Sequence, residues 1–277
     1  MDAVAKQYAG TKKLRIGFEN NNATYQLAKA LAKFGKLIEL GGTLDQARWV
    51  KSPSEIAAIR ASVDLNSKAL ASAMKRFKVG MTEKELAAEI DHQMRKLGAE
   101  GGAFETIVAS GAHSALPHAR PRDAKILEGG YLLIDMGACL NGYMSDMTRT
   151  FGVGKMSREA ERIYDAVLEA QQSAIDAIRP GAVTGDVHDA AVAGLKVHKL
   201  DKLFTHSTGH GLGLEIHEGP GFRSGDQTPL KPGMAVTVEP GVYRAGYGGV
   251  RIEDTVLVTA SGVEILTPTP KDWTIVG

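Results

Sequence analysis

The spacing of apolar residues changes twice between strand and helix along the first fifty positions. Leu14 to Phe18 is a short apolar run, Ala23 to Phe34 has helical spacing, and Lys36 to Leu40 returns to a strand pattern. A single strand–helix–strand of this size buries too little surface to be stable alone. We therefore expect residues 1–50 to be the end of a domain and not a whole one.

Helix-start signals predict two pairs of helices in the rest of the chain. The four starts are, in order, Ser52, Thr82, Ser157 and Thr184. The first two carry capping boxes, completed by Glu55 and Glu85. The breaks inside the two pairs, Phe77 to Thr82 and Ile178 to Thr184, occupy equivalent places, which indicates an internal repeat.

Strand patterns lie after each helix pair. The predicted strands are Glu105 to Ser110, Tyr131 to Ala138, Tyr143 to Phe151, Ala235 to Glu239 and Gly249 to Val258. Two halves, each a helix pair followed by strands, predict an α+β fold with pseudo-symmetry. In this fold the helices would cover one face of a curved, largely antiparallel sheet.

Composition and charge narrow the class of protein. A chain of 277 residues with 43% hydrophobic content can form one large domain with a small appendage. The formal net charge of +1 gives no reason to expect nucleic acid or an anionic membrane as the main partner. The single cysteine excludes an internal disulfide, and no secretory leader or membrane-span pattern is visible, so we expect a cytoplasmic protein.

Two aspartates are placed where they could meet. Asp135 ends an apolar run, where an unpaired carboxylate would be costly. Asp146 lies on the other arm of a hairpin predicted at Asn141-Gly142. Carboxylates that face each other share a proton or bind cations. Taken alone, however, strand-end aspartates are more often turn residues.

A glycine-rich segment adds three histidines, His206, His210 and His217. Glycines allow a backbone to approach a ligand closely. The segment lacks the strand–GxGxxG–helix order of a dinucleotide site and does not match the HExxH zinc helix. Its chemistry therefore depends on what else lies near it.

Two glutamates complete the candidate site. Glu239 ends an apolar strand pattern, and Glu253 shares one face of another strand with Arg251. A buried arginine–glutamate pair explains the second spacing equally well. Four carboxylates and one histidine, each at a strand end or glycine bend, together predict a metal site. Such ligands suit Mn²⁺, Co²⁺ or Zn²⁺ better than a thiolate zinc site would.

Over about residues 50–270, these motifs resemble the pita-bread metallopeptidases. This group includes methionine aminopeptidases, Xaa-Pro aminopeptidases and prolidases. The resemblance implies a pita-bread catalytic domain at residues 51–277. Residues 1–50 would then be the remnant of an N-terminal creatinase-like domain, shortened relative to the family.

The resemblance also implies two divalent metal ions, with Mn²⁺ expected. Asp135 would bind one ion with both oxygens, while Asp146 and Glu253 would bridge the two. His210 and Glu239 would complete the shell of the other ion.

Further residues resemble those that contact the substrate in the Xaa-Pro branch. His118 is similar to the histidine near the scissile bond, His217 to the one that binds the substrate carbonyl, and His206 to the extra histidine of this branch. Tyr243 and Arg251 resemble residues that contact substrate or transition state. His118, His206 and His217 are therefore expected in catalysis as well, together with Glu239.

The implied function is hydrolysis of an N-terminal Xaa-Pro bond in short peptides or dipeptides through a metal-bridging hydroxide. The expected partners are short peptides with proline at the second position, and a homodimer is an open alternative. A methionine-type aminopeptidase is the alternative activity. A catalytically inactive pita-bread binding module is the alternative from another class.

Other reactive side chains need no catalytic role. His92, His188 and His198 lie in predicted helices and are expected at the surface or half-buried. His113 lacks the Leu-Pro context that marks His118. Cys139 has no basic partner in the pattern, so we expect an inert thiol.

Overall fold

A computed structural model describes residues 14–277. The chain divides into two compact units, Met1–Arg48 and Trp49–Gly277. The elements of the first unit are β1 (Leu14–Phe18), α2 (Tyr25–Leu31) and β2 (Gly35–Glu39), followed by α3 (Thr43–Trp49), which reaches the boundary. The strands β1 and β2 are parallel. The predicted strand–helix–strand is therefore confirmed, with a shorter helix than the apolar pattern indicated.

The interpretation of residues 1–50 as a domain remnant stays a prediction. Part of that range, residues 1–13, lies outside the described residues. Within the described part, Thr24 caps α2 by accepting a hydrogen bond from the Leu27 amide at 3.2 Å. This local cap explains why the helix begins at Tyr25.

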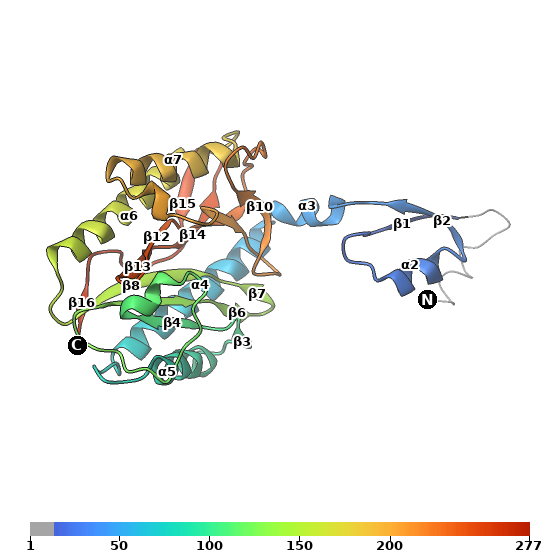
Figure 1. Ribbon diagram of the computed structural model, residues 1–277. Coiled ribbons are helices and arrows are strands. Elements are labelled where there is room, and N and C mark those ends of the chain that lie inside the picture. The colour runs from blue at the N-terminus through green and yellow to red at the C-terminus, as the bar shows by residue number, and fades with distance from the viewer. Residues whose placement is uncertain (1–13) are drawn as a thin grey trace. The chain divides into compact units, whose positions relative to one another are not determined.

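The second unit contains the two predicted helix pairs (Figure 1). They are α4 (Pro53–Met74), α5 (Glu83–Lys96), α6 (Arg158–Ala177) and α7 (Thr184–Val197), with short 3₁₀ turns η1 (Gly111–Ala115) and η2 (Asp201–Leu203). Both capping boxes are present, at Ser52 with Glu55 and at Thr82 with Glu85. None of the described helices is long and apolar enough to cross a membrane.

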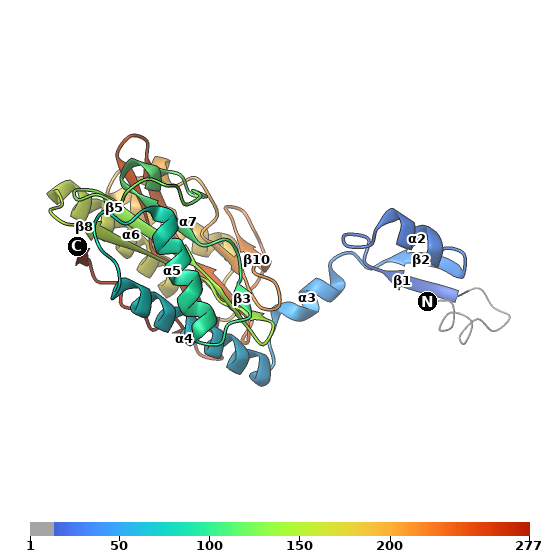
Figure 2. The ribbon, with the colours of Figure 1, turned by 90° about the horizontal axis from the view of Figure 1, so that it is seen from below.

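The strands of the second unit lie between the α4–α5 pair and the α6–α7 pair (Figure 1). They are β3 (Gly101–Gly102), β4 (Ile107–Ser110), β5 (Tyr131–Met136), β6 (Ala138–Leu140), β7 (Tyr143–Met144), β8 (Met147–Val153), β9 (Gly209–Gly211), β10 (Glu218–Phe222), β11 (Ala235–Val238), β12 (Gly241–Arg244), β13 (Gly248–Arg251), β14 (Asp254–Val258), β15 (Val263–Ile265) and β16 (Ile275–Val276). The larger sheets have the orders β16-β8-β5-β4 and β10-β9-β11-β14-β15. Figure 2, which views the molecule from below, shows α4 and α5 in front of the strands.

Three predicted strands are broken where the site lies. The predicted strand 131–138 is interrupted at Gly137, and the predicted strand 143–151 is interrupted next to Ser145. The cause is a hydrogen bond between the two segments, in which the Ser145 hydroxyl accepts from the Ala138 amide at 2.9 Å. The run 249–258 breaks at Ile252 and Glu253, where the Glu253 amide leaves its own ladder and donates to the Thr148 carbonyl at 3.1 Å. The prediction of continuous strands there was wrong, because hydrogen bonds to other segments of the chain determine where the strands are interrupted.

The predicted pseudo-symmetry is confirmed by matching backbone bonds in the two halves. Gly80 N donates to Ile126 O at 2.9 Å, and Gly181 N donates to Leu230 O at 2.9 Å. The strand registers match as well: Ile134 is paired with Arg149, and Val238 is paired with Asp254. One residue farther along these strands, Asp135 and Thr148 are therefore the counterparts of Glu239 and Glu253.

The helix pairs supply the cores that hold these strands. In the first half, apolar residues of α4 and α5, such as Leu70 and Ile90, pack on Leu132 and Ile134 of β5. In the second half, residues of α6 and α7 pack in the same way on β11 and β14, for example Val187 on Val236. Burial of this apolar surface fixes both strand layers and leaves their ends free to carry polar groups.

Candidate metal centre and substrate pocket

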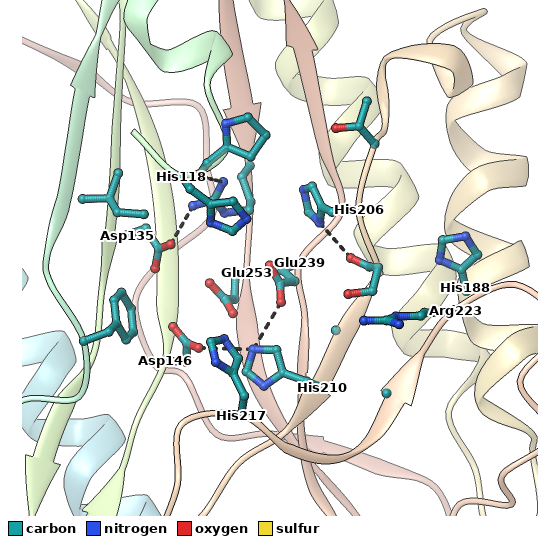
Figure 3. A pocket seen from close by; sticks show the side chains of 18 of the residues that line it. His118, Asp135, Asp146, His188, His206, His210, His217, Arg223, Glu239 and Glu253 are labelled. Carbon is teal, nitrogen blue, oxygen red and sulfur yellow. Dashed lines mark hydrogen bonds and ion pairs between the residues drawn. The ribbon is translucent and has the colours of Figure 1, made fainter. Parts of the chain in front are cut away.

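All five predicted metal ligands line one pocket of about 1150 Å³ in the second unit (Figure 3). They lie in strands or directly beside strand ends in both halves: Asp135, Asp146, His210, Glu239 and Glu253. The breaks in the strands turn these side chains toward a common space. The structure thus brings together residues that lie up to 118 positions apart in the sequence, from Asp135 to Glu253.

Three of the five form a compact group. Ligand atoms of Asp146, His210 and Glu253 all lie within 4.8 Å of one another. The carbonyl of Gly211 lies 3.0 Å from His210 Nδ1 and can only accept, so Nδ1 carries the proton. The lone pair of Nε2 is therefore free, 3.6 Å from an Asp146 oxygen and 3.4 Å from a Glu239 oxygen. This is the arrangement of a histidine prepared to bind a metal.

Asp135 approaches the same space from β5. One oxygen, Oδ2, accepts a hydrogen bond from Arg251 Nη2 at 2.6 Å. The other, Oδ1, is buried and has no hydrogen-bond partner within the described chain. A buried carboxylate oxygen without a donor is costly, and a cation would satisfy it.

Arg251 organises the floor of the pocket. Its guanidinium is buried and also donates to Thr148 Oγ1 at 3.0 Å and to the Tyr243 hydroxyl at 2.7 Å. Thr148 in turn donates to Glu253 Oε2 at 2.7 Å. The predicted Arg251–Glu253 relationship is thus indirect, because Thr148 lies between them in the hydrogen-bond chain.

Electrostatics in the pocket favour a cation. Burial, reinforced by neighbouring carboxylates, raises the pKa of Asp146 and of Glu253 well above their ordinary values. Burial also raises the pKa of Glu239 to about 7, although Arg251 opposes the shift. Carboxylates held so close together can all ionise only if positive charge is added. The residues therefore fit divalent metal ions, with mainly oxygen ligands and one imidazole.

His206 is held by protein on both ring nitrogens. Nδ1 lies 2.8 Å from the Ser207 carbonyl and must donate, so Nε2 accepts from the Tyr243 hydroxyl at 2.8 Å. Burial, with Arg251 nearby, lowers the pKa of His206 to about 4, which agrees with a neutral ring. Only the carbon edge of His206 is left to face a ligand.

His118 and His217 lie on opposite sides of the acidic group (Figure 3). Both are exposed. The His217 ring meets His210 edge to face, with centroids 4.5 Å apart. His113 is directed away and bonds to Glu83 at 3.0 Å, so the choice of His118 over His113 as a pocket residue agrees with the geometry.

His188 and Arg223 are among the pocket residues that the sequence reasoning missed. His188, on α7, is half-buried as expected, but it lines the pocket and bonds to Thr208 Oγ1 at 2.9 Å. Arg223 follows β10 and points into the pocket (Figure 3). By strand alternation Arg223 shares the face of Gly221, which pairs with His210, but this pairing is visible only in the structure. No local signal marks His188.

The remaining predictions hold for residues outside the pocket. His92 is exposed, and His198 is half-buried and bonds to Glu169 at 2.7 Å. Cys139 is half-buried beside Glu100, and burial together with that carboxylate raises the pKa of its thiol. A raised thiol pKa agrees with the predicted low reactivity.

Comparisons with known proteins agree with this site. The chain matches metallopeptidase family M24 over residues 57–260. A Xaa-Pro dipeptidase from Pyrococcus furiosus is 42% identical over 234 residues, covering 84% of this chain and 67% of that protein.

Solved structures give the same result. An X-Pro aminopeptidase from Thermotoga maritima has a TM-score of 0.94 at 36% identity, covering 99% of this chain and 79% of that one. A Xaa-Pro dipeptidase from Bacillus anthracis has a TM-score of 0.95 at 39% identity, covering 99% and 78%. The chain therefore belongs to metallopeptidase family M24, in the branch of Xaa-Pro dipeptidases and aminopeptidases, and has the pita-bread fold, as predicted.

Proposed function

We propose that the protein hydrolyses the bond between an N-terminal residue and a following proline in short peptides, using two divalent cations. The ligands would be the five pocket residues Asp135, Asp146, His210, Glu239 and Glu253. The observation that carries this proposal is the convergence of four carboxylates and the free His210 Nε2 on one pocket of an M24 peptidase.

Charge balance supports two cations over one. Among the described residues, Arg251 is the guanidinium that forms an ion pair with one of the four carboxylates, that of Asp135. One divalent cation would leave an excess of negative charge in a buried site, whereas two reverse it. Asp135, with its unpartnered Oδ1, and the group around His210 offer two neighbouring sets of ligands. Mn²⁺ suits these oxygen-rich ligands, and Co²⁺ or Zn²⁺ are alternatives.

Bound cations of this kind lower the pKa of a water molecule toward neutrality and polarise a carbonyl oxygen. Glu239 would carry the proton, because its carboxylate lies among the proposed ligands and therefore next to a water molecule held by the cations. The nitrogen of a Xaa-Pro bond is a tertiary amide and must gain a proton as it leaves. Glu239 is the group that would deliver it.

The histidines would bind and orient the peptide. His217, next to His210, would donate to the substrate carbonyl as charge develops on its oxygen. His118 would hold the peptide from the opposite side. His206 offers only ring carbons, so it would pack on the proline ring of the substrate. Tyr243 would hold His206 in place, and Arg251 would hold Asp135.

A kinetic comparison tests the proposal. The purified protein with added Mn²⁺ is given Ala-Pro, Ala-Pro-Gly and Met-Ala-Ser, and kcat/KM is measured for each. Preference for Ala-Pro identifies a Xaa-Pro dipeptidase, and preference for Ala-Pro-Gly identifies an aminopeptidase. Preference for Met-Ala-Ser would overturn the Xaa-Pro assignment. A metal-loaded protein that cleaves none of them would be a binding module.

A further inference from the structure

Glu83, the first residue of α5, is a carboxylate sealed inside the protein. Its side chain is 0% exposed. It accepts hydrogen bonds from the amide and hydroxyl of Ser110, both at 2.9 Å, and from His113 Nδ1 at 3.0 Å. It also accepts from the amide of Arg122 at 3.1 Å and from its Nε at 3.2 Å. A buried charge is retained only where such bonds compensate for its desolvation.

All these donors belong to one segment, 110–122, and they lie toward its two ends. The middle of the segment carries Pro117 and His118, which line the pocket. This middle part is held on β13, where Ser114 Oγ accepts from the Gly249 amide at 2.8 Å and the Pro117 carbonyl accepts from Arg251 Nη1 at 3.2 Å. One carboxylate therefore closes the base of the loop that carries His118.

The second half of the molecule provides an internal comparison. Glu83 N donates to Ala124 O at 3.1 Å, and Thr184 N donates to Thr228 O at 3.0 Å, so Thr184 is the counterpart of Glu83. Thr184 is fully buried, and its hydroxyl has no partner in the described part of the chain. The second half thus forms the same helix start without a buried charge, and there the helix start does not anchor a loop that carries a pocket histidine.

We infer that Glu83 is a positioning residue for catalysis, which fixes His118 over the metal centre by clamping both ends of the segment 110–122. The inference rests on the proposed function for the role of His118. The helix start itself does not require the carboxylate, because the second half forms the same backbone bond with threonine.

The test copies the second half into the first. Glu83→Thr is compared with Thr184→Val, the matched change at the counterpart position. We expect Glu83→Thr to keep full metal content but to lose about 10- to 100-fold in kcat/KM, since small misplacements of a substrate-binding group have effects of this size. Thr184→Val should keep wild-type kinetics.

A double-mutant cycle separates positioning from general weakening of the fold. In a His118→Ala background, Glu83→Thr should cost less than about twofold, because the group that it positions is already absent. Losses that multiply in the double variant, or wild-type kinetics in Glu83→Thr, would overturn the inference. If Glu83→Thr does not fold, Arg122→Met removes two of the donors from a half-exposed side chain and must show the same coupling to His118.

Hydrogen exchange gives a readout that does not need activity. The backbone amides of residues 115, 116 and 118–120 should exchange faster in Glu83→Thr than in the wild type, and at the wild-type rate in Thr184→Val. Unchanged exchange in Glu83→Thr contradicts the clamp. If wild-type protein cleaves no peptide but the exchange result holds, the proposed function fails while the clamp stands.

Discussion

The two halves of the second unit share a backbone plan but carry different chemistry. The first half contributes Asp135 and Asp146 to the pocket, and the second contributes His210, Glu239 and Glu253. Only one pair among these five occupies equivalent positions, Asp135 and Glu239. The repeat therefore supplies the strand ends, and sequence divergence supplies the ligands.

Positions near the pseudo-symmetry axis meet their own counterparts. Thr148 donates to Glu253 at 2.7 Å, and Arg149 donates to Asp254 at 2.8 Å, and each pair consists of equivalent residues. Identical residues there would repel or leave atoms unpaired. Different residues at these equivalent positions therefore give two complementary pairs that join the halves, and one of them includes the predicted ligand Glu253.

The largest effect is expected from removing one ligand in either half. Asp146→Ala and Glu239→Ala should each abolish Xaa-Pro hydrolysis, with losses above about 1,000-fold in kcat/KM, because removing a group that acts as part of one catalytic unit has effects of this size. Asp64→Asn, which neutralises an exposed carboxylate on α4 paired with Lys68, is the control and should retain activity. If either folded pocket variant kept the wild-type rate, the assignment would fail.

The next largest effect should come from the axis pair. Arg149 donates to the carbonyls of Thr148 and Glu253 as well as to Asp254, and both charged side chains are buried. Arg149→Met should lower the free energy of unfolding by about 3–5 kcal/mol, since it removes the donor to Asp254 Oδ1 and to four backbone carbonyls, and Lys271 pairs only with the other Asp254 oxygen. Urea denaturation measures this.

A surface pair serves as the control for that change. Arg60 and Glu264 form a 2.6 Å ion pair whose side chains are 42% and 44% exposed. Arg60→Met should cost less than about 1 kcal/mol. Equal costs at Arg60 and Arg149 would contradict a special role for the axis.

A smaller effect links metal to pH. Glu239 has a folded pKa of about 7, and the folded pKa values of Asp146 and Glu253 are raised as well, so the folded metal-free protein binds more protons than the unfolded chain above the ordinary carboxyl range. The extra protons stabilise the folded metal-free protein at low pH, and this contribution to the free energy of unfolding is lost as pH rises through about 7. The Tm of chelator-treated protein should therefore fall between pH 5 and pH 8 relative to Mn²⁺-loaded protein. Parallel Tm curves would argue against cation binding by these groups.

The smallest effect is expected at the counterpart of Glu83. Thr184→Val removes a buried hydroxyl without a partner and should raise the free energy of unfolding by up to about 1 kcal/mol. Chemical denaturation measures this change, and the kinetic constants of the variant should equal those of the wild type. A loss above about 1 kcal/mol would mean that the hydroxyl makes a contact essential to the second half.

Local signals predicted the helices well, because caps such as Ser52 with Glu55 act within one turn. The strand breaks were not predicted, because they depend on hydrogen bonds between distant segments, such as the bond from the Glu253 amide to the Thr148 carbonyl. The five candidate ligands were found from motifs, and their convergence agrees with the structure. Thr148 was missed, since in sequence it is an ordinary strand residue whose partner lies 105 positions away, at Glu253.

The account's central claim is that both halves together hold two cations. Anomalous diffraction from crystals grown with Mn²⁺ tests it most directly. We predict two peaks about 3.5–4 Å apart, between Asp135 on one side and His210 on the other, with Asp146 and Glu253 touching both. A single peak, or none, among these side chains would contradict the claim.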